Sequence, residues 1–133
     1  MALKKLNSCK ILVCGGRNFN NKDFIFNSLD RLFSDTLLTV VHGGATGVDS
    51  IANEWATQRN HNIKAYPIHQ EEWNTYGKKA GYLRNKKMLD LNPDINLVIA
   101  FDGGSGTKMM ITLASQRNIK VVRLSEEYAH EFF

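Results

Sequence analysis

The sequence predicts an α/β fold with a mainly parallel, five-stranded sheet that is covered by helices on both faces. Short apolar runs of strand length alternate with segments whose apolar residues recur at helical spacing. A helix that joins two strands makes a right-handed crossover, so this alternation favours parallel strands. With 133 residues, the chain has the length of one ordinary domain. We therefore expect a single domain over residues 1–133, with its core in 10–124 and a C-terminal tail in 125–133.

Each predicted strand is a short apolar run that is rich in β-branched residues and bounded by turn residues. The first run, KILVC, ends at Gly15-Gly16, and the second ends at Gly43-Gly44. Pro67 favours the end of the third run, because proline cannot donate a hydrogen bond to a sheet. These features predict strands over 10–14, 37–41, 63–68, 97–101 and 120–124.

The predicted helices carry an apolar stripe along one side. The clearest stripe follows the second strand, with apolar residues at positions 48, 51, 52, 55 and 56. A later helix stops before Pro93, because the residue before a proline disfavours the α region. Helices are expected over 23–33, 48–56, 80–91 and 107–116.

The least regular segment runs from the end of the third strand into the start of the helix expected at 80–91. Trp73, Tyr76 and Tyr82 stand there around two glycines, Gly77 and Gly81. Such a segment is either a lid that stacks a base or a long loop with aromatic packing beneath it.

The composition is that of an ordinary globular protein with a mild positive charge. Seventeen Lys and Arg residues against 13 Asp and Glu give a net charge of +4, which fits a phosphate-bearing ligand but does not favour nucleic acid as a partner. No apolar run approaches the roughly 18 residues of a membrane span, and no signal peptide is evident, so we expect no membrane partner and a cytoplasmic location. Cys9 and Cys14 lack the spacing of a redox pair or a zinc site, and the four histidines stand singly. We expect no metal site and no required cofactor.

Glycine pairs follow three of the predicted strands, at 15–16, 43–44 and 103–104. They let the backbone turn sharply and let a ligand approach where a Cβ would intrude, although loops between strands and helices use glycines in any case. The second and third pairs lead into helix N-termini, which favour anions. The loops therefore predict a phosphate site at the carboxyl edge of the sheet. The expected ligand-binding residues are Gly15, Gly16, Arg17, Gly43, Gly44, Thr46, Arg84, Gly103, Gly104, Ser105, Gly106 and Thr107.

Some of these residues have equally simple structural interpretations. Arg17 fits an exposed loop arginine nearly as well, and Thr46 and Thr107 fit helix N-caps. Two common phosphate motifs are also incomplete: Thr107-Lys108 reverses the order of a Walker motif, and Met109 replaces the third glycine of the dinucleotide fingerprint. A P-loop NTPase and an ordinary NAD dehydrogenase are therefore disfavoured.

Arg84 lies on a helical stripe that is otherwise apolar and contains Ala80, Met88 and Leu91. A charge on such a stripe must be paired or must reach a ligand, because burying it alone is very costly. Arg84 is therefore a candidate for binding the ligand, a role that the family resemblance given below favours over the structural ones. The alternatives are an arginine that extends along the apolar surface to solvent, or a buried ion pair.

Asp102 and Asp49 are the candidate catalytic residues. Asp102 ends a predicted strand just before a glycine loop, where functional carboxylates commonly stand in α/β sheets. Asp49 follows Thr46 by three residues, so it either completes a capping box or binds ribose hydroxyls or acts as a base. His42 and Cys14 are expected to be structural. His42 is expected to have its hydrogen bonds met within the fold, and Cys14 to be a small buried residue.

Three segments taken together resemble a known family: HGGATGVDSIANEWA at 42–56, AGYLRNKKML at 80–89 and AFDGGSGTKMM at 100–110. They are similar to the YspA-like branch of the SLOG superfamily, which includes the lonely-guy phosphoribohydrolases and the Rossmann domain of DNA-processing protein A. The resemblance runs over residues 11–124. It implies a single Rossmann-like domain with a pocket for nucleotides or nucleotide-derived molecules.

One position departs from the lonely-guy pattern. Those enzymes resemble one another in a Gly-Gly-x-Gly-Thr-x-x-Glu motif whose glutamate takes part in cleaving the N-glycosidic bond. Met110 stands in the place of that glutamate, whereas Arg84 matches the arginine of the same family. The resemblance therefore implies the phosphate-binding half of the motif and disfavours a lonely-guy reaction.

These observations predict a domain that binds a nucleotide or a nucleotide-derived molecule, such as an ADP-ribose derivative, as a sensor or sequestering domain. One alternative is a hydrolase of N-glycosidic or phosphoester bonds, with Asp102 or Asp49 as the base. A less favoured alternative is a binder of single-stranded nucleic acid. Whether the protein is an enzyme stays open. We also expect a homo-oligomer, a dimer or higher.

Overall fold

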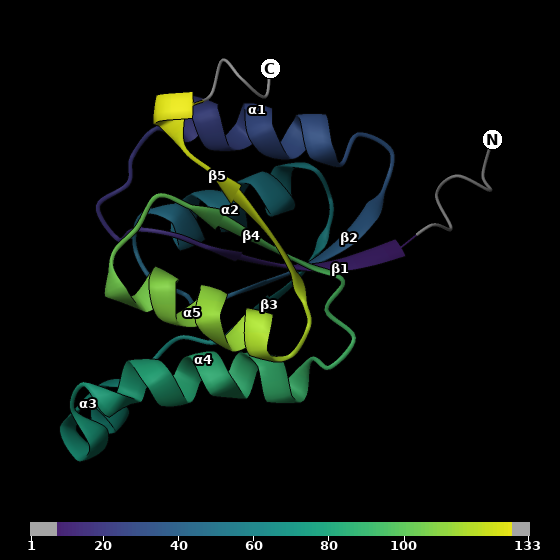
Figure 1. Cartoon of the computed structure of the whole chain (residues 1–133). Coiled ribbons are helices and arrows are strands. Elements are labelled where there is room, and N and C mark those ends of the chain that lie inside the picture. Colours follow the sequence, from purple (N-terminus) through teal and green to yellow (C-terminus); the bar gives the residue numbers. More distant parts are fainter. Residues whose placement is uncertain (1–7, 129–133) are drawn as a thin grey trace.

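The computed structural model describes residues 8–128 and shows a five-stranded sheet in which every pair of neighbouring strands is parallel (Figure 1). The order across the sheet is β3-β2-β1-β4-β5. The predicted α/β fold with a parallel sheet is confirmed. The strands are β1 (Ser8–Cys14), β2 (Leu37–His42), β3 (Asn62–Ala65), β4 (Leu97–Phe101) and β5 (Lys120–Leu124).

Helices cover both faces of the sheet, with α1 and α2 on one side and α4 and α5 on the other (Figure 1). The short helix α3 packs on α4 and projects beyond the sheet. The helices are α1 (Lys22–Leu32), α2 (Val48–Gln58), α3 (Gln70–Tyr76), α4 (Lys79–Leu91) and α5 (Ser105–Gln116), followed by the 3₁₀ turn η2 (Glu126–Tyr128). None of the helices in residues 8–128 has the length and apolar character that a membrane span needs.

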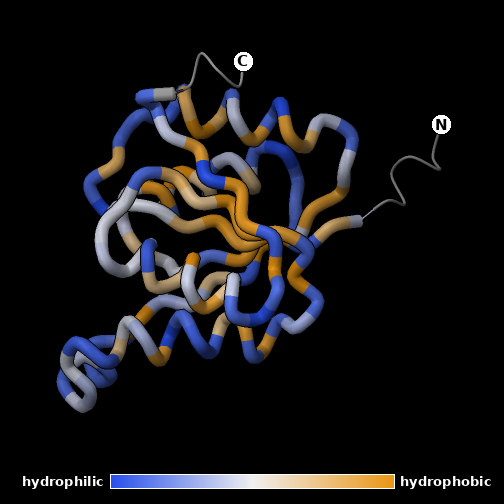
Figure 2. The backbone as a smooth tube through the Cα atoms, viewed as in Figure 1, coloured by the Kyte–Doolittle hydropathy of each residue, from blue (hydrophilic) through white to orange (hydrophobic). Residues whose placement is uncertain are grey.

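The central strand β1 is buried on both faces, as a parallel sheet between two helical layers requires. Successive side chains of a strand point to opposite faces. Ile11 and Val13 accordingly belong to the core cluster under α1 and α2, and Leu12 belongs to the cluster under α4 and α5. Figure 2 shows the hydrophobic residues gathered along the central strands.

The strand order reverses at β1. The chain adds β2 and β3 on one side of β1 and then returns to place β4 and β5 on the other side. In open α/β sheets, ligands bind in the crevice at the carboxyl ends of the strands where the order reverses. The glycine loops after β1 and β4 lie at this point of the sheet.

Several boundaries differ from those expected from the sequence. β3 ends at Ala65, before Pro67, instead of continuing to position 68. α5 begins at Ser105 instead of 107, because Gly104 forms its N-cap. The segment after β3 contains α3, which was not expected because none of its residues is buried and it has no apolar stripe.

One further expectation is wrong, and others concern residues outside the described range. Leu91 is 57% exposed, so it does not belong to the inward stripe of α4, which continues through Leu89 instead. Within the expected tail at 125–133, residues 126–128 form the turn η2. Residues 129–133 lie outside the described residues. The same holds for residues 1–7, which the expected absence of a signal peptide concerns.

Candidate functional site

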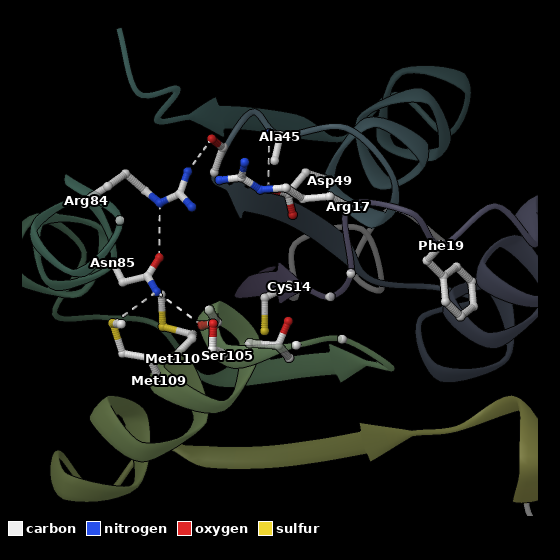
Figure 3. A pocket seen from close by; sticks show the side chains of 18 of the residues that line it. Cys14, Arg17, Phe19, Ala45, Asp49, Arg84, Asn85, Ser105, Met109 and Met110 are labelled. Atoms are coloured by element: carbon white, nitrogen blue, oxygen red, sulfur yellow. Dashed lines mark hydrogen bonds between the residues drawn. The ribbon is translucent and has the colours of Figure 1, made fainter. Parts of the chain in front are cut away.

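A cavity of about 760 Å³ lies at the carboxyl ends of β1 and β4. It is lined by the loop after β1, the loop after β2 with the start of α2, the helices α3 and α4, and the loop from β4 into α5 (Figure 3). Gly44 and Thr46 lie outside the lining. The cavity brings together the other residues that were expected to bind or react: Gly15, Gly16, Arg17, Gly43, Asp49, Arg84, Asp102, Gly103, Gly104, Ser105, Gly106 and Thr107.

The three glycine loops are joined to one another by their backbones. The N–H of Gly16 donates to the carbonyl of Asp102 at 2.8 Å, and the N–H of Val48 donates to the carbonyl of Gly16 at 3.1 Å. A side chain at Gly47, whose φ is +75°, would collide with the backbone of Gly16. Packing of loop on loop therefore explains part of the glycine content. This packing also occupies the first N–H group of α2, at a helix start that was expected to bind an anion.

The start of α5, in contrast, is open to the cavity. No side chain caps this end of the helix, and a Cβ at Gly104 or Gly106 would meet no heavy atom within 4 Å. The first N–H groups of a helix have no acceptor within the helix. The amides from Ser105 to Thr107 therefore face a space where a ligand can reach them. Of the two helix N-termini expected to bind phosphate, α5 offers the accessible one.

Arg84 reaches from α4 toward the loop after β2 (Figure 3). Its Nη1 donates to the carbonyls of Gly43 and Tyr66, and its Nε donates to Oδ1 of Asn85 at 3.0 Å. Burial lowers the pKa of the guanidinium, although an arginine stays charged at neutral pH. Within residues 8–128 no carboxylate forms an ion pair with Arg84. The buried ion pair considered from the sequence is therefore absent from this part of the chain.

Asn85 is a site residue that the sequence analysis missed. It is 5% exposed. Besides accepting from Arg84, its Nδ2 donates to the carbonyl of Gly106 at 3.3 Å and lies 3.9 Å from the sulfur of Met109 (Figure 3). It thus links the guanidinium to the first turn of α5. Its spacing of four residues before Leu89, on the inward face of α4, was the signal that could have revealed it.

Asp49 is 6% exposed and lines the cavity from the first turn of α2. Its Oδ2 accepts from the N–H of Ala45 at 3.2 Å. The capping box with Thr46 does not form, because Gly47 is the N-cap and the Thr46 hydroxyl donates to the carbonyl of Arg17. Burial raises the pKa of Asp49, since an ionised carboxylate is disfavoured away from water.

The other candidate carboxylate, Asp102, is exposed and serves the C-terminal turn. Its Oδ2 accepts from the hydroxyl of Ser125 and from the N–H of Glu126, both at 3.3 Å. Asp102 still borders the cavity. Met110, in the place of the lonely-guy glutamate, is 1% exposed and contributes an apolar surface to the same cavity.

His42 and Cys14 have structural environments. The Nδ1 of His42 accepts from the N–H of Gly44, so its Nε2 carries the proton and donates to Oδ1 of Asn53 at 2.8 Å. Burial, with the nearby charge of Asp49, raises the pKa of Cys14 to about 12, so this residue is a neutral thiol and not a nucleophile at neutral pH. Within residues 8–128 no three His, Cys, Asp or Glu side chains gather closely enough to hold a metal ion.

The sequence matches the model of the YspA, cpYpsA-related SLOG family over residues 9–73. It is also 32% identical over 122 residues to the Gene 61 protein of Mycobacterium phage D29, an alignment that spans 89% of this chain and 98% of that protein. The chain belongs to the YspA, cpYpsA-related SLOG family. Membership suggests nucleotide-related binding or processing.

A solved structure shares the fold of this SLOG domain. DNA processing protein A (DprA) from Streptococcus pneumoniae superposes on 86% of the chain with a TM-score of 0.69, at 19% sequence identity. The chain spans half the length of that protein. At this level of identity the likeness concerns the Rossmann-like fold alone.

Proposed function

We propose that the protein binds a nucleotide or a nucleotide-derived small molecule, such as an ADP-ribose derivative, as a sensor or sequestering domain. The ligand phosphate would lie between Arg84 and the N-terminus of α5. The observation that carries this proposal is the half-buried guanidinium of Arg84, which borders the same cavity as an uncapped helix start and pairs with no carboxylate in residues 8–128.

Physical chemistry favours an anion at this place. A charge that is partly removed from water is costly unless a partner compensates it. The hydrogen bonds of Arg84 go to carbonyl and amide oxygens without net charge, and the attraction of Asp49 does not offset the burial of the guanidinium. The positive end of the α5 dipole acts in the same direction. Arg17 and Lys78 add two more cations to the lining. The volume of about 760 Å³ is within the range of small-molecule pockets.

Calorimetric titration of the full chain with ADP-ribose and with AMP tests this proposal. Arg84→Ala should weaken binding by about 2–3 kcal/mol, the scale of a hydrogen bond to a charged group. Arg84→Lys should restore only part of that loss, because an ammonium does not supply the planar fork of a guanidinium. Arg117→Ala is the matched control, since Arg117 pairs with Asp90 and is absent from the lining. Failure of both compounds to bind wild type, or equal affinity in Arg84→Ala, would reject the proposal.

The same variants separate ligand binding from a structural role of Arg84. Breaking a buried ion pair on one side costs roughly 3–5 kcal/mol of folding stability. Arg84 makes hydrogen bonds to neutral oxygens instead, so Arg84→Ala should lower the free energy of unfolding by no more than about 1–2 kcal/mol. Urea denaturation measures this difference, and a loss on the ion-pair scale with unchanged affinity would mark Arg84 as structural.

A hydrolase is the second candidate, and the buried carboxylate of Asp49 is the observation that favours it. In such a reaction Asp49 would take one proton from a water molecule whose oxygen bonds to the anomeric carbon as the bond to the base breaks. The leaving base would take a proton from solvent water, and Asp49 would return its own proton to solvent. Chromatography of AMP incubated with the protein would detect free adenine. Release of adenine by wild type but not by Asp49→Asn would support this reaction, and no release by either would limit the site to binding.

Binding of single-stranded nucleic acid is a third outcome that the same titrations distinguish. The name of the structurally similar DprA refers to DNA processing, and a nucleotide within a strand carries the same phosphate and base as a free nucleotide. A single-stranded oligonucleotide that binds far more tightly than AMP, in a salt-dependent manner, would favour nucleic acid over a small ligand.

A further inference from the structure

The proposed function leaves one part of the cavity without a role, namely the end bordered by α3. Trp73 is the residue of α3 that lines this cavity. It is half-buried, yet it belongs to neither core cluster and to neither set of side chains packed against those clusters. By comparison, Phe19 also lines the cavity, but its ring is packed against Phe24 and Phe101. Trp73 therefore presents an aromatic surface that the core does not use.

The indole of Trp73 has one described aromatic contact, with Arg17 from the loop after β1. The guanidinium carbon of Arg17 lies 5.6 Å from the ring centroid. Arg17 is exposed and forms no ion pair with any carboxylate in the described part of the chain. An exposed cation–π contact of this kind is weak, so an incoming ring can replace it at little cost. The contact places a flat, cationic group against the indole at the edge of the cavity.

We propose that Trp73 is the stacking platform for the base of the bound nucleotide, and that Arg17 occupies this platform until the base arrives. This inference rests on the proposed function, because it takes the phosphate to lie at Arg84 and the start of α5. It adds an orientation: the base points toward α3 and the phosphate toward α5. Stacking on an aromatic side chain tolerates any base, since every base has a flat face. The site would therefore distinguish a nucleotide from a sugar phosphate without reading the identity of the base.

The structure of α3 is consistent with this role. The helix has no buried residue, and it is largely hydrophilic in Figure 2. Its contacts to the rest of the protein are made chiefly with α4. Replacing Trp73 should therefore leave the fold intact, which makes a direct test feasible.

The test compares two compounds, AMP and ribose 5-phosphate, which share a sugar phosphate but differ in the base. Calorimetric titration of wild type and Trp73→Ala should show about a tenfold loss of AMP affinity in the variant, the lower part of the range for one stacked base. The affinity for ribose 5-phosphate should not change. Trp73→Phe should recover part of the AMP affinity. Tyr82→Ala is the matched control, an exposed aromatic on α4 that is absent from the lining.

Intrinsic fluorescence gives a second readout. Of the two tryptophans, Trp55 is 1% exposed and its indole N–H donates to Asp30, so its emission should not respond to a ligand in the cavity. AMP should quench the emission of wild type but not of Trp73→Phe, and ribose 5-phosphate should quench neither.

The outcomes separate the two proposals. Equal binding of AMP and ribose 5-phosphate, or a Trp73→Ala variant that loses affinity for both alike, would overturn the stacking role and leave the phosphate site standing. If neither compound bound wild type, the proposed function and the stacking role would both be wrong.

Discussion

Arg84 from α4 and Asp49 from α2 bring opposite charges to one cavity without forming an ion pair with each other. Each is held by neutral partners: Arg84 by carbonyl and amide oxygens, and Asp49 by the N–H of Ala45. Burial disfavours the charge of both, so it lowers the pKa of Arg84 and raises that of Asp49. The attraction between the two charges opposes these shifts without outweighing them. Perturbed pKa values of neighbouring groups in a cavity are typical of a site that a polar ligand completes.

The raised pKa of Asp49 gives a pH dependence whose sign can be worked out. The folded protein holds the Asp49 proton more tightly than the unfolded chain, whose aspartate has a pKa of about 3.9. As pH rises through the unfolded pKa to the folded one, the unfolded chain binds fewer protons than the native state, and the free energy of unfolding falls. Asp49→Asn cannot ionise, so it lacks this pH-dependent fall in the free energy of unfolding. It keeps a side-chain oxygen that can accept the hydrogen bond from Ala45. Its stability relative to wild type should therefore increase as pH rises above about 4, until the folded carboxyl has also ionised.

Urea denaturation at several pH values measures this trend. Asp94→Asn is a control with the opposite sign, because the hydrogen bond from Lys10 lowers the pKa of Asp94. For this pair, the stability of wild type relative to Asp94→Asn should fall as pH falls. The change in the free energy of unfolding should be small because Asp94 is exposed. A stability difference for Asp49→Asn that stays constant with pH would show that burial does not disfavour its charge.

The residues differ in how far the sequence could predict them. Arg84 was predictable, because a charge on an apolar helical stripe stands out. Asn85 was missed, because an amide in a segment rich in lysines resembles an ordinary surface residue, although its spacing from Leu89 places it on the inward face of α4. The contact of Asp49 with Ala45 could not be foreseen either, because the spacing to Thr46 fits a capping box equally well, and only the loop structure decides between them.

At the scale of elements, the two helices that follow glycine loops have different N-termini. Neither helix start has a side-chain cap. The first N–H of α2 donates to the loop after β1, whereas the first residues of α5 line the cavity. Both loops have similar glycine-rich sequences, so the difference arises from the way the loops pack. The same reasoning explains why α3 was missed: a seven-residue helix without buried residues has no periodic pattern to detect.

Two neighbouring glycines before α5 provide a matched pair of variants. A side chain at Gly104, with φ of −99°, would extend into open space, whereas a Cβ at Gly103 would collide with Thr107 and with the N–H of Gly16. Gly104→Val should therefore leave the melting temperature nearly unchanged but abolish AMP binding by blocking the amides of α5. Gly103→Ala should destabilise the fold, by about 1–3 kcal/mol as for other overpacked positions. Thermal melts and calorimetry measure the two effects, and full AMP affinity in Gly104→Val would place the phosphate elsewhere.

At the scale of the whole molecule, the strand order positions the site. The alternation of apolar runs and amphipathic helices was enough to predict a parallel sheet with two helical layers. It could not predict the order β3-β2-β1-β4-β5, because that order depends on which edge of β1 each crossover adds to. The order matters for function, since it splays the loops after β1 and β4 apart and opens the crevice between them. Segments far apart in the sequence, at 15–19, 43–49, 78–88 and 102–110, thereby contribute to one cavity.

We propose that a phosphate binds between Arg84 and the start of α5. A crystal structure of the full chain with ADP-ribose or AMP tests it most directly. We expect phosphate oxygens within hydrogen-bond distance of the Arg84 guanidinium and of the amides of Ser105 and Gly106, with the base toward Trp73. A phosphate bound anywhere else, or an empty cavity in crystals grown with saturating ligand, would contradict the claim.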